Sequence, residues 1–384
     1  MTRRIRLGDV ATYINGYAFK PADRGEKGLP IIRIQDLTGN AYDLGFYDGE
    51  YPEKIEINDG DVLISWSASL GVYVWNRGKA LLNQHIFKVA FDKTEINKQY
   101  FVYAVKYKLI EMASKTHGAT MKHIVKKDFD ATEIPYLDIK QQEEIANILD
   151  KASFVIEARK QELEKLDDLI KARFIEMFGE PFINPMEWKK IKIEDAVTVE
   201  PQNGMYKPQS DYVADGSGTP ILRIDGFYNG AVTDFSSLKR LVCDDKEKQK
   251  YLLEDDDIVI NRVNSIEYLG KCAHITGLLE ETVYESNMMR MHFDSERFNP
   301  VYVTRLLCSR FVYDQIINHA KKAVNQASIN QKDVLDFDIY QPPLELQNEF
   351  ADFVNQVDKS KVVVQKALDE AQLLFDSLMQ KYFG

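Results

Sequence analysis

Short polar segments at equivalent points of the two halves of the chain carry most of the side chains suited to ligand chemistry. Amides, hydroxyls, imidazoles and cations of this kind hydrogen-bond to base edges and phosphates when they project from loops. In the first half they are Ser65, Ser67, Ser69, Asn83, Gln84, His85, Thr120, Lys122, His123, Lys126 and Lys127. In the second half they are Asn261, Arg262, Asn264, Ser265, Asn287, Lys321, Lys322, Asn325, Gln326, Ser328 and Asn330. Their matching placement favours one shared face in each half.

Each of these residues has a structural alternative. Asn83 and Asn264 are typical turn-formers, whose side chains bond the local backbone. Any other single member can be a solvated loop residue. Arg33 and Arg223, inside matching predicted strands, can equally pair with a buried carboxylate. The pattern therefore predicts a polar surface more strongly than any one contact.

The motifs of several catalytic and metal sites are absent from the sequence. There is no Asn/Asp-Pro-Pro-Tyr/Phe segment, which an adenine methyltransferase needs to hold the amino group of a flipped base. There is no phosphate-cradling Gly-x-x-x-x-Gly-Lys-Ser/Thr, and Asp215-Gly-Ser-Gly-Thr-Pro220 is predicted to be a turn because a strand follows it. His117, His123 and the three cysteines lack metal-ligand spacing. We expect no catalytic residue, metal site or cofactor site in this chain.

Length and charge restrict the class of protein. The chain has 384 residues and a net charge of -11, and more than one domain is expected at this length. No run of about 18 apolar residues could span a bilayer, and the amino terminus lacks the apolar segment of a secretory signal. We therefore expect a cytoplasmic protein that does not enter a membrane. The acidic balance argues against a generally basic nucleic-acid-binding surface but allows a local basic face.

The elements that must position the polar segments occur twice. Ile139–Ile145 aligns with Leu344–Phe350, and Phe174–Gly179 with Met379–Gly384, both at an offset of 205 residues. Upstream blocks match at smaller offsets: Pro30 with Pro220 at 190, Asp61 with Asp257 at 196, and Asn97 with Asn299 at 202. The offset is constant within blocks and grows between them, so insertions have collected in the connections. A repeat of this size indicates one unit used twice.

Each half is predicted to begin with an α+β domain. Short β-branched runs between Gly and Asp residues predict strands at Pro30–Ile34, Asp61–Trp66, Val72–Trp75 and Ile86–Phe91. The second half repeats the order at Pro220–Ile224, Ile258–Asn261 and Met288–Phe293. Helical spacing of apolar residues predicts a helix over Tyr100–Met112 and a counterpart near Val301–Ile317.

A long segment with the 3.5-residue apolar spacing of a coiled-coil seam follows each domain. The seam residues are Ile156, Leu163, Leu166, Ile170 and Met177 in the first segment, and Val364, Leu368, Ala371, Phe375 and Leu378 in the second. Each seam covers about 29 residues, or about 43 Å. The alternative, two unrelated amphipathic core helices, does not account for the matching phase. Charged seam positions such as Arg159 and Lys361 weaken each helix as a stand-alone dimeriser. They are tolerable if the two helices pair with each other or with helices of partner chains.

These patterns predict two α+β domains separated by two long helices. If the helices pair as an antiparallel coiled coil, the domains are related by a pseudo-twofold axis and lie at opposite ends. The predicted boundaries are 1–138 and 182–341 for the domains, and 139–181 and 342–384 for the long-helix regions.

This doubled order resembles the DNA-specificity (S) subunit of type I restriction–modification systems. Gln341-Pro-Pro-Leu-Glu-Leu-Gln-Asn-Glu-Phe350 is similar to the family pattern Pro-Pro-Leu-x-x-Gln-x-x-Ile. Arg6–Val10 and Lys190–Ala196 resemble the start of each target-recognition domain, and Gly60–Ile64 and Asp256–Ile260 resemble its central strand. The resemblance covers the whole chain, although no single motif is specific. Two departures, Leu137-Asp138 in place of the Pro pair and Phe350 in place of an aliphatic residue, keep the apolar pattern.

The resemblance implies that each target-recognition domain reads one half of a bipartite site in double-stranded DNA, and that the helix pair fixes the gap. Half-sites one duplex turn apart, about 34–36 Å, lie on one face of the DNA. It also implies two modification subunits, which bring S-adenosylmethionine and methylate adenine, and restriction subunits, which use ATP and Mg. The polar residues named above are then candidates for DNA contact. Because the loops differ, for example at Trp66 and Arg262, an asymmetric target is expected.

Two other classes of function fit a duplicated chain. A coiled-coil scaffold that binds a protein or a glycan agrees with the acidic balance but not with the polar loops. A free-standing endonuclease would need a carboxylate cluster at catalytic spacing, which we do not find in the sequence. Salt-dependent DNA binding separates the scaffold from the specificity subunit, because phosphate neutralisation gives a log–log slope proportional to the number of contacts.

Overall fold

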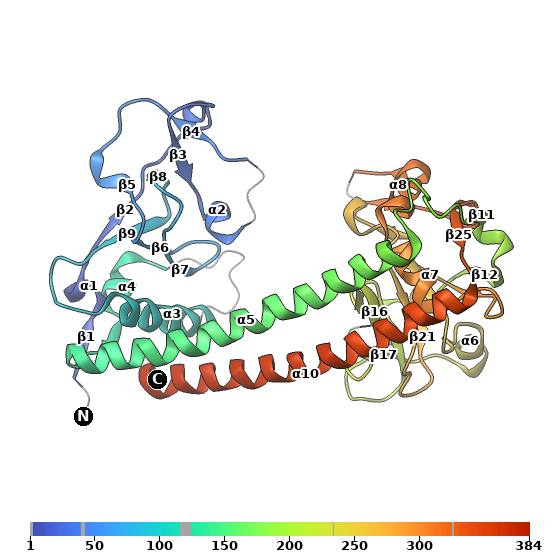
Figure 1. The fold of residues 1–384 in the computed structure, drawn as a ribbon. Coiled ribbons are helices and arrows are strands. Elements are labelled where there is room, and N and C mark those ends of the chain that lie inside the picture. Colours follow the sequence, from blue (N-terminus) through green and yellow to red (C-terminus); the bar gives the residue numbers. More distant parts are fainter. Residues whose placement is uncertain (1–2, 40–42, 116–123, 233, 325) are drawn as a thin grey trace. The chain divides into compact units, whose positions relative to one another are not determined.

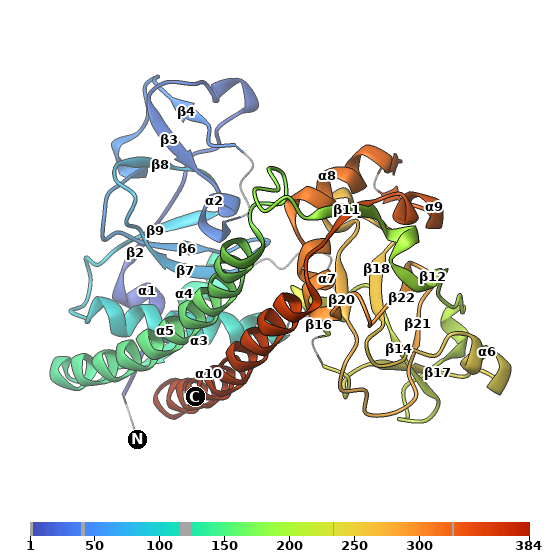
Figure 2. The ribbon, with the colours of Figure 1, turned by 45° about the vertical axis from the view of Figure 1, so that its right-hand side comes forward.

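A computed structural model describes residues 3–39, 43–115, 124–232, 234–324 and 326–384 (Figures 1 and 2). The chain divides into unit 1, comprising Met1–Gln161 and Val364–Gly384, and unit 2, comprising Glu162–Val363. Each long helix therefore contributes one part to each unit. The domain boundaries predicted from the sequence follow the chain order and stay a prediction.

Unit 1 is an α+β unit of short strands and a few helices. Its strands are β1 (Arg4–Arg6), β2 (Thr12–Asn15), β3 (Leu29–Ile32), β4 (Phe46–Tyr47), β5 (Glu56–Ile57), β6 (Val62–Ser65), β7 (Gly71–Val74), β8 (Ala80–Leu82), β9 (Ile86–Ala90) and β10 (Glu133–Pro135). Its helices are α1 (Leu7–Val10), α2 (Ile34–Thr38), α3 (Lys98–Lys115), α4 (Lys126–Ala131), the 3-10 turns η1 (Pro21–Asp23) and η2 (Glu53–Ile55), and the first part of α5 (Ile139–Phe178).

The strands of unit 1 form sheets in the orders β1-β10, β2-β9-β6-β7 and β4-β3-β8-β5. The inward faces of β6 and β9 pack on α3, and α3 packs on α5 and on the end of α10 (Leu344–Phe383). In Figure 1, α3 accordingly lies between the sheet β2-β9-β6-β7 and the long helices. The opposite face of β6 carries Leu63, which belongs to a separate small core with Trp75 and Ile86.

Unit 2 repeats the same plan with more strands. Its strands are β11 (Lys189–Lys192), β12 (Val197–Asn203), β13 (Tyr212–Val213), β14 (Thr219–Leu222), β15 (Phe227–Tyr228), β16 (Gly230–Val232), β17 (Lys239–Leu241), β18 (Ile258–Asn261), β19 (Val263–Asn264), β20 (Cys272–His274), β21 (Val283–Tyr284), β22 (Met288–Phe293), β23 (Lys321–Lys322), β24 (Ala327–Ser328) and β25 (Asp338–Gln341). Its shorter helices are α6 (Asp245–Lys250), α7 (Pro300–Leu307), α8 (Arg310–His319), α9 (Gln331–Leu335) and the 3-10 turns η3 (Ile193–Asp195), η4 (Gln209–Asp211) and η5 (Ile266–Tyr268).

The sheets of unit 2 have the orders β11-β25, β12-β22-β18-β20-β16-β15, β13-β17-β14-β21 and β19-β24-β23. The offsets seen in the sequence recur in the element bounds. Strand β14 is β3 moved by 190 residues, β18 is β6 moved by 196, and α10 is α5 moved by 205. Pairing is also repeated, since β3 is parallel to β8 and β14 is parallel to β21. The predicted duplication of α+β domains is confirmed.

The two long helices pack against each other in antiparallel fashion within each unit. In unit 1, Ile156 of α5 shares a core with Phe375 and Met379 near the end of α10. In unit 2, Ile170 near the end of α5 shares a core with Phe350 near the start of α10. Each helix is 40 residues long, longer than the 29-residue seam, because its first turns belong to the core of a unit. All ten predicted seam residues are buried or half-buried.

A buried glutamine fixes the start of each long helix. Gln142 donates to the Leu137 carbonyl at 2.8 Å and accepts the Asn97 N–H at 2.8 Å. Gln347 repeats both bonds, to the Pro342 carbonyl at 2.9 Å and from the Asn299 N–H at 2.9 Å. A backbone carbonyl accepts this bond whatever its side chain. The replacement of the Pro pair by Leu137-Asp138 therefore leaves the start of α5 unchanged.

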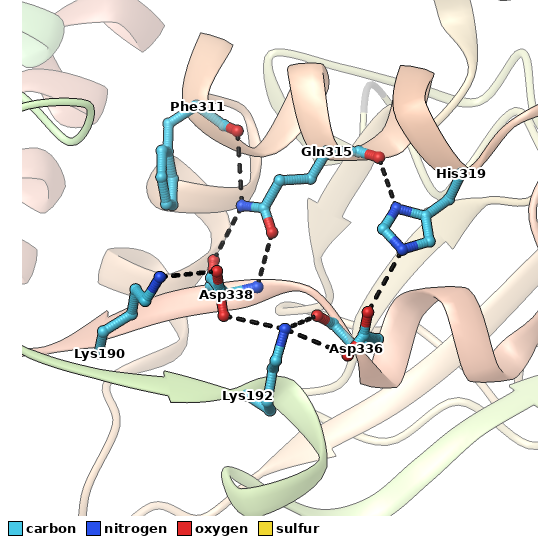
Figure 3. A network of polar contacts seen from close by, with 7 residues as sticks. All are labelled: Lys190, Lys192, Phe311, Gln315, His319, Asp336 and Asp338. Atoms are coloured by element: carbon cyan, nitrogen blue, oxygen red, sulfur yellow. Dashed lines mark hydrogen bonds and ion pairs between the residues drawn. The ribbon is translucent and has the colours of Figure 1, made fainter.

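In unit 2, a polar network ties the ribbon β11-β25 to α8 (Figure 3). Lys192 bonds Asp336 at 3.1 Å and Asp338 at 3.0 Å, and its ammonium lowers the pKa of Asp336. Gln315 of α8 accepts the Asp338 N–H at 2.7 Å, and His319 lies 3.3 Å from Asp336. Backbone and side-chain bonds together hold the outer ribbon on the helix.

One predicted helix is wrong in its extent. The pattern over Val301–Ile317 predicts a single helix, but the chain forms α7 and α8 with a break at Cys308 and Ser309. Ser309 has the extended backbone of a helix N-cap, so the continuous i to i+4 bonding stops there. In unit 1 the equivalent helix α3 is unbroken over 18 residues.

Candidate nucleic-acid interface

Two backbone hydrogen bonds of Trp66, together called the crossing, bring the predicted polar segments of unit 1 together. The Trp66 N–H donates to the His85 carbonyl at 3.3 Å, and the Trp66 carbonyl accepts the Ile124 N–H at 3.0 Å. Trp66 follows directly after β6, His85 precedes β9, and Ile124 precedes α4. Three segments separated in sequence therefore meet at one end of the sheet β2-β9-β6-β7.

Unit 2 contains the same crossing. The Arg262 N–H donates to the Asn287 carbonyl at 2.8 Å, and the Arg262 carbonyl accepts the Ile329 N–H at 3.0 Å. Arg262, Asn287 and Ile329 are offset from Trp66, His85 and Ile124 by the 196, 202 and 205 residues of their blocks. The predicted polar segments thus converge twice, on the same backbone frame.

The hydroxyls that follow β6 divide into buried and exposed groups. Ser65 is fully buried and donates to the Ser69 carbonyl at 2.5 Å, and Ser67 is 8% exposed. Ser69 is exposed at the surface. Ser65 has a structural bond that shapes this loop, and contact of any of the three with DNA stays a prediction.

The second and third segments of unit 1 combine turn formation with exposed cations. Asn83 accepts the Gln84 N–H at 2.9 Å, which is the turn-forming bond expected as its alternative role. His85 has a positive φ of 71° and packs edge-on against the Trp66 ring at 4.9 Å. Lys126 pairs with Asp130 at 2.7 Å, and Lys127 is exposed. Gln84, Lys126 and Lys127 therefore present exposed polar groups.

In unit 2, the residue at the end of the central strand is a buried amide. Asn261 is fully buried, and neither atom of its carboxamide has a hydrogen-bond partner. The next residue, Arg262, is half-buried and donates from Nη1 to the Ser286 carbonyl at 3.1 Å. Asn264 accepts the Ser265 N–H at 2.8 Å, the same turn bond that Asn83 makes. Arg262 is the cation closest to the crossing point.

The third segment of unit 2 forms the small sheet β19-β24-β23. Ser328 pairs with Val263, and Lys322 pairs with Ala327. Lys321, Lys322 and Gln326 are exposed. Asn330 caps α9 by accepting the Lys332 N–H at 2.9 Å, which gives it a structural role beside its predicted contact. Two adjacent lysines therefore stand on the outer strand of this small sheet, separated from β19 by β24.

Some candidates lie outside the described residues. They are Thr120, Lys122, His123 and Asn325, together with the histidine His117.

Sequence reasoning missed one segment in each unit. Tyr17 bridges to Asn83, and Met205 bridges to Glu285, each in parallel orientation beside the second polar segment. The preceding glycines permit this approach, because a Cβ on Gly16 would lie 2.0 Å from the Asn83 carbonyl oxygen, and Gly204 is equally confined. The signal was the repeated Asn-Gly pair that begins both segments, at an offset of 188 residues.

The matched arginines pair with carboxylates, as their structural alternative predicted. Arg33 lies 3.1 Å from Asp36, which is 6% exposed. Arg223 lies 3.8 Å from Glu285, which is 8% exposed. Burial raises the pKa of Glu285, while the Ile224 N–H and Arg223 lower it. Both arginines therefore have carboxylate partners within their own unit.

The part of the chain that the structure describes lacks two kinds of feature. No group of three or more His, Cys, Asp or Glu side chains there could hold a metal ion. No helix in the same part of the chain is both long and apolar enough to cross a bilayer.

Comparison with known proteins follows the same two-part division. Residues 3–167 and 185–371 match the family model described as "Type I restriction modification DNA specificity domain". The chain is 22% identical to the type I restriction enzyme EcoBI specificity subunit of Escherichia coli, over 99% of this chain and 85% of that protein. It is 25% identical to the EcoKI specificity subunit of Escherichia coli strain K12, over 98% of this chain and 87% of that protein.

Solved structures show the same fold. The S subunit of a type I restriction–modification system from M. genitalium aligns with a TM-score of 0.58 at 15% identity, covering 100% of this chain and 96% of that one. A chain from a study of complex assembly and conformational transition in a type I system aligns with a TM-score of 0.55 at 15% identity, covering 99% and 97%.

Proposed function

We propose that this chain, which belongs to the family of type I restriction–modification DNA specificity domains, reads one half of a bipartite DNA site with the polar loops of each unit. The observation that carries the proposal is the doubled crossing at Trp66 and Arg262. The same backbone bonds hold loops whose side chains differ. Two domains that read different DNA sequences require the same loop backbone with different side chains.

The side chains at the two crossings support an asymmetric target. Arg262 carries a guanidinium, which bonds guanine edges in the major groove or phosphates, and Lys321 and Lys322 stand nearby on β23. Trp66 offers no cation at the equivalent point, and its ring stacks on Phe87 at 5.5 Å. The two half-sites therefore differ in sequence, and the whole site is not a palindrome.

The paired long helices set the gap between the half-sites. The helices pack through apolar seams in both units, and in unit 2 Lys361 reaches Asp167 at 2.7 Å across the pair. A helix pair with fixed register acts as a spacer of fixed length, whereas unpaired helices would let the gap between the half-sites vary.

The outer faces of the long helices support docking of partner subunits. Leu169 and Leu374 occupy equivalent positions at the 205-residue offset and are 47% and 57% exposed. Two equivalent apolar positions suit two copies of one partner, the modification subunit, which supplies S-adenosylmethionine and methylates adenine. Restriction subunits with ATP and Mg join this complex in the cytoplasm, and this chain supplies no catalytic step.

The docking surface is tested by replacing Leu169 and Leu374 with glutamate, singly and together. Each single variant is expected to bind one modification subunit and the double variant neither, measured by light scattering of the purified complexes. Lys171→Glu, another exposed change on the same helix, is the control. Unchanged stoichiometry in the double variant would exclude these two positions as the docking surface.

DNA reading is tested with the full chain and its modification subunits. Methylome sequencing of the host defines the site, and binding of a duplex carrying that site is measured over a range of salt concentrations. Affinity is expected to fall linearly on a log–log plot, because Lys and Arg displace counterions from phosphates. Binding that ignores salt, or no binding with modification subunits present, supports the protein- or glycan-binding scaffold. Cleavage by the isolated chain with magnesium would support an endonuclease.

A further inference from the structure

Two cysteines of unit 2 face each other across the interface between β20 and α7, which lie side by side in Figure 2. Cys272 of β20 is fully buried, and Cys308, the residue after α7, is exposed. Their sulfur atoms are 3.3 Å apart. A disulfide has its sulfurs about 2.0 Å apart, so the two sulfurs must approach each other further to be joined.

The two thiols differ in their surroundings. The contact with Cys272 lowers the pKa of the Cys308 thiol, packing of protein atoms around its sulfur opposes this, and Arg305 lowers the pKa further. The same contact raises the pKa of Cys272, as does burial. Cys308 also lines a cavity of about 360 Å³ together with Arg305 and Arg310. Because Cys308 is exposed and lines this cavity, whereas Cys272 is buried, Cys308 is the thiol that an oxidant reaches first.

We propose that Cys272 and Cys308 form a redox-active thiol pair that a hydroperoxide converts into an intrachain disulfide. The Cys308 thiolate attacks hydrogen peroxide, the O–O bond breaks, and hydroxide leaves and becomes water by taking up a proton. The sulfur of Cys272 then attacks the resulting sulfenic acid, and its S–O bond breaks to release a second water. Two thiols lose two electrons, and one peroxide is reduced to two waters.

The duplication places this pair in one unit only. Val72 occupies the position of Cys272, since Val72 pairs with Ile64 and Cys272 with the equivalent Ile260. Lys106 occupies the position of Cys308 at the 202-residue offset. Unit 1 cannot form the bridge and serves as an internal reference.

The bridge would act at the base of a proposed DNA-reading loop. Residues 262–271 connect β18 to β20, and Cys272 is the first residue of β20. A disulfide to the end of α7 would hold this connection more tightly on the helix. The consequence for DNA reading rests on the proposed function, whereas the chemistry of the thiol pair is independent of DNA binding.

The test uses the full chain, treated with hydrogen peroxide and then with an alkylating reagent. The reduced, denatured chain has three alkylatable cysteines, and the oxidised chain is expected to retain one, Cys243. Peptide mass spectrometry should find a Cys272–Cys308 cross-link that a reductant reverses. A stable sulfenic acid on Cys308 without the cross-link, or a bridge to Cys243, would overturn the proposal.

Three variants make the result specific. Cys308→Ser is expected to abolish the cross-link and leave Cys272 reduced. Cys272→Ala should instead leave Cys308 as a trappable sulfenic acid. Cys243→Ser, the control, should leave the cross-link unchanged. Circular dichroism of each variant verifies folding, and the surface position of Cys308 makes its variant the safest of the three.

Hydrogen exchange tests the effect of the bridge on the loop. Oxidation is expected to slow exchange in residues 262–271 and to leave residues 66–70, the equivalent loop of unit 1, unchanged. Equal exchange before and after oxidation would show that the bridge forms without constraining the loop. Slowing in both units would point to a general effect of peroxide and contradict the local constraint.

Discussion

Asp61 and Asp257 occupy the same turn in the two units, yet their side chains differ in solvent exposure. Each accepts a backbone N–H from the residue three positions earlier at 2.8 Å. Each also faces a cation on the equivalent neighbouring strand, Lys88 at 3.0 Å or Arg290 at 2.9 Å. The side chain of Asp61 is 25% exposed and that of Asp257 is 1% exposed. The duplication has kept the ion pair while changing how deeply it is buried.

The crossings at Trp66 and Arg262 differ in side-chain chemistry rather than in a kept ion pair. There the backbone bonds are the same, and the chemistry of the side chain has changed from an aromatic ring to a guanidinium. Backbone hydrogen bonds do not depend on side-chain type, so substitutions at these positions leave the loop in place. The two comparisons together separate the frame, where pairing is kept, from the loops, where side chains vary.

The largest expected effect comes from separating the two units along the helix pair. We propose inserting seven residues after Leu166 in α5 together with seven after Lys361 in α10, because Lys361 faces Asp167 across the pair. A heptad keeps the seam and adds about 10 Å. Binding to the native site should weaken by about 4 kcal/mol or more, since specific binding exceeds nonspecific binding by at least this amount.

A matched DNA series completes that test. Sites with a gap lengthened by about three base pairs, at about 3.4 Å each, should recover part of the affinity, because the added pairs also rotate one half-site by about 100° around the duplex. The seven-residue insertion after Leu166 alone, which mismatches the seams, is the control and should recover less. An unchanged preferred gap in the doubly extended chain would refute the helix pair as a spacer.

The next largest effect is expected at the buried ion pair. Asp257→Asn leaves Arg290 without its carboxylate in a buried site, which costs about 3–5 kcal/mol. Asp61→Asn removes a partly exposed pair and should cost about 1 kcal/mol or less. Denaturant unfolding of both variants measures the difference. Equal losses would show that burial does not distinguish the two turns.

The pH dependence of stability gives a second measure of the same site. Burial raises the pKa of Asp257, while the Glu254 N–H, Arg290 and His292 lower it, and the net shift is upward. Because a raised folded-state pKa favours the protonated form, its stabilising contribution is complete below the unfolded pKa and is lost as pH rises through the folded pKa. Asp257→Asn should remove this decline, and a decline that persists would assign it to another group.

Much of this frame follows from sequence, and particular residues show why. Strands β3 and β14 were predictable because apolar β-branched runs with the same offset mark both. The bridges from Tyr17 and Met205 were not, because parallel contacts between distant segments leave no local periodicity. The break between α7 and α8 was also missed, since Val301–Ile317 keeps a helical apolar pattern across Ser309. Sequence therefore predicted the polar loops and their convergence, but not which side chains are buried, such as Asn261.

A smaller effect is expected from the side chain at the second crossing. Arg262→Ala should weaken binding by about 1–3 kcal/mol and relax selectivity in one half-site only, because a guanidinium contact discriminates base edges. Arg262→Lys, which keeps the charge and loses the planar fork, separates base contact from phosphate contact. Affinities for duplexes with single changes in each half-site provide the measurement. A uniform loss across all sequences would assign Arg262 to phosphate contact.

Trp66 supplies the contrasting variant in unit 1. Its ring stacks on Phe87 at 5.5 Å and contacts His85 at 4.9 Å. Trp66→Ala should therefore lower the free energy of unfolding. Its effect on selectivity for the half-site read by unit 1 should be smaller than this loss of stability when both are expressed as free energies. If Trp66→Ala relaxes selectivity as strongly as Arg262→Ala without loss of stability, both crossing residues read DNA.

The smallest expected difference lies between the two buried glutamines. Gln347 makes one bond more than Gln142, because it also donates to the Arg297 carbonyl at 3.0 Å. Gln347→Leu should therefore destabilise the chain by about 1 kcal/mol more than Gln142→Leu, the net value of one hydrogen bond. Hydrogen exchange at the first turns of α5 and α10 locates each loss. Equal costs would mean that the third bond adds nothing, and that the starts of both helices depend only on the two bonds that the duplication kept.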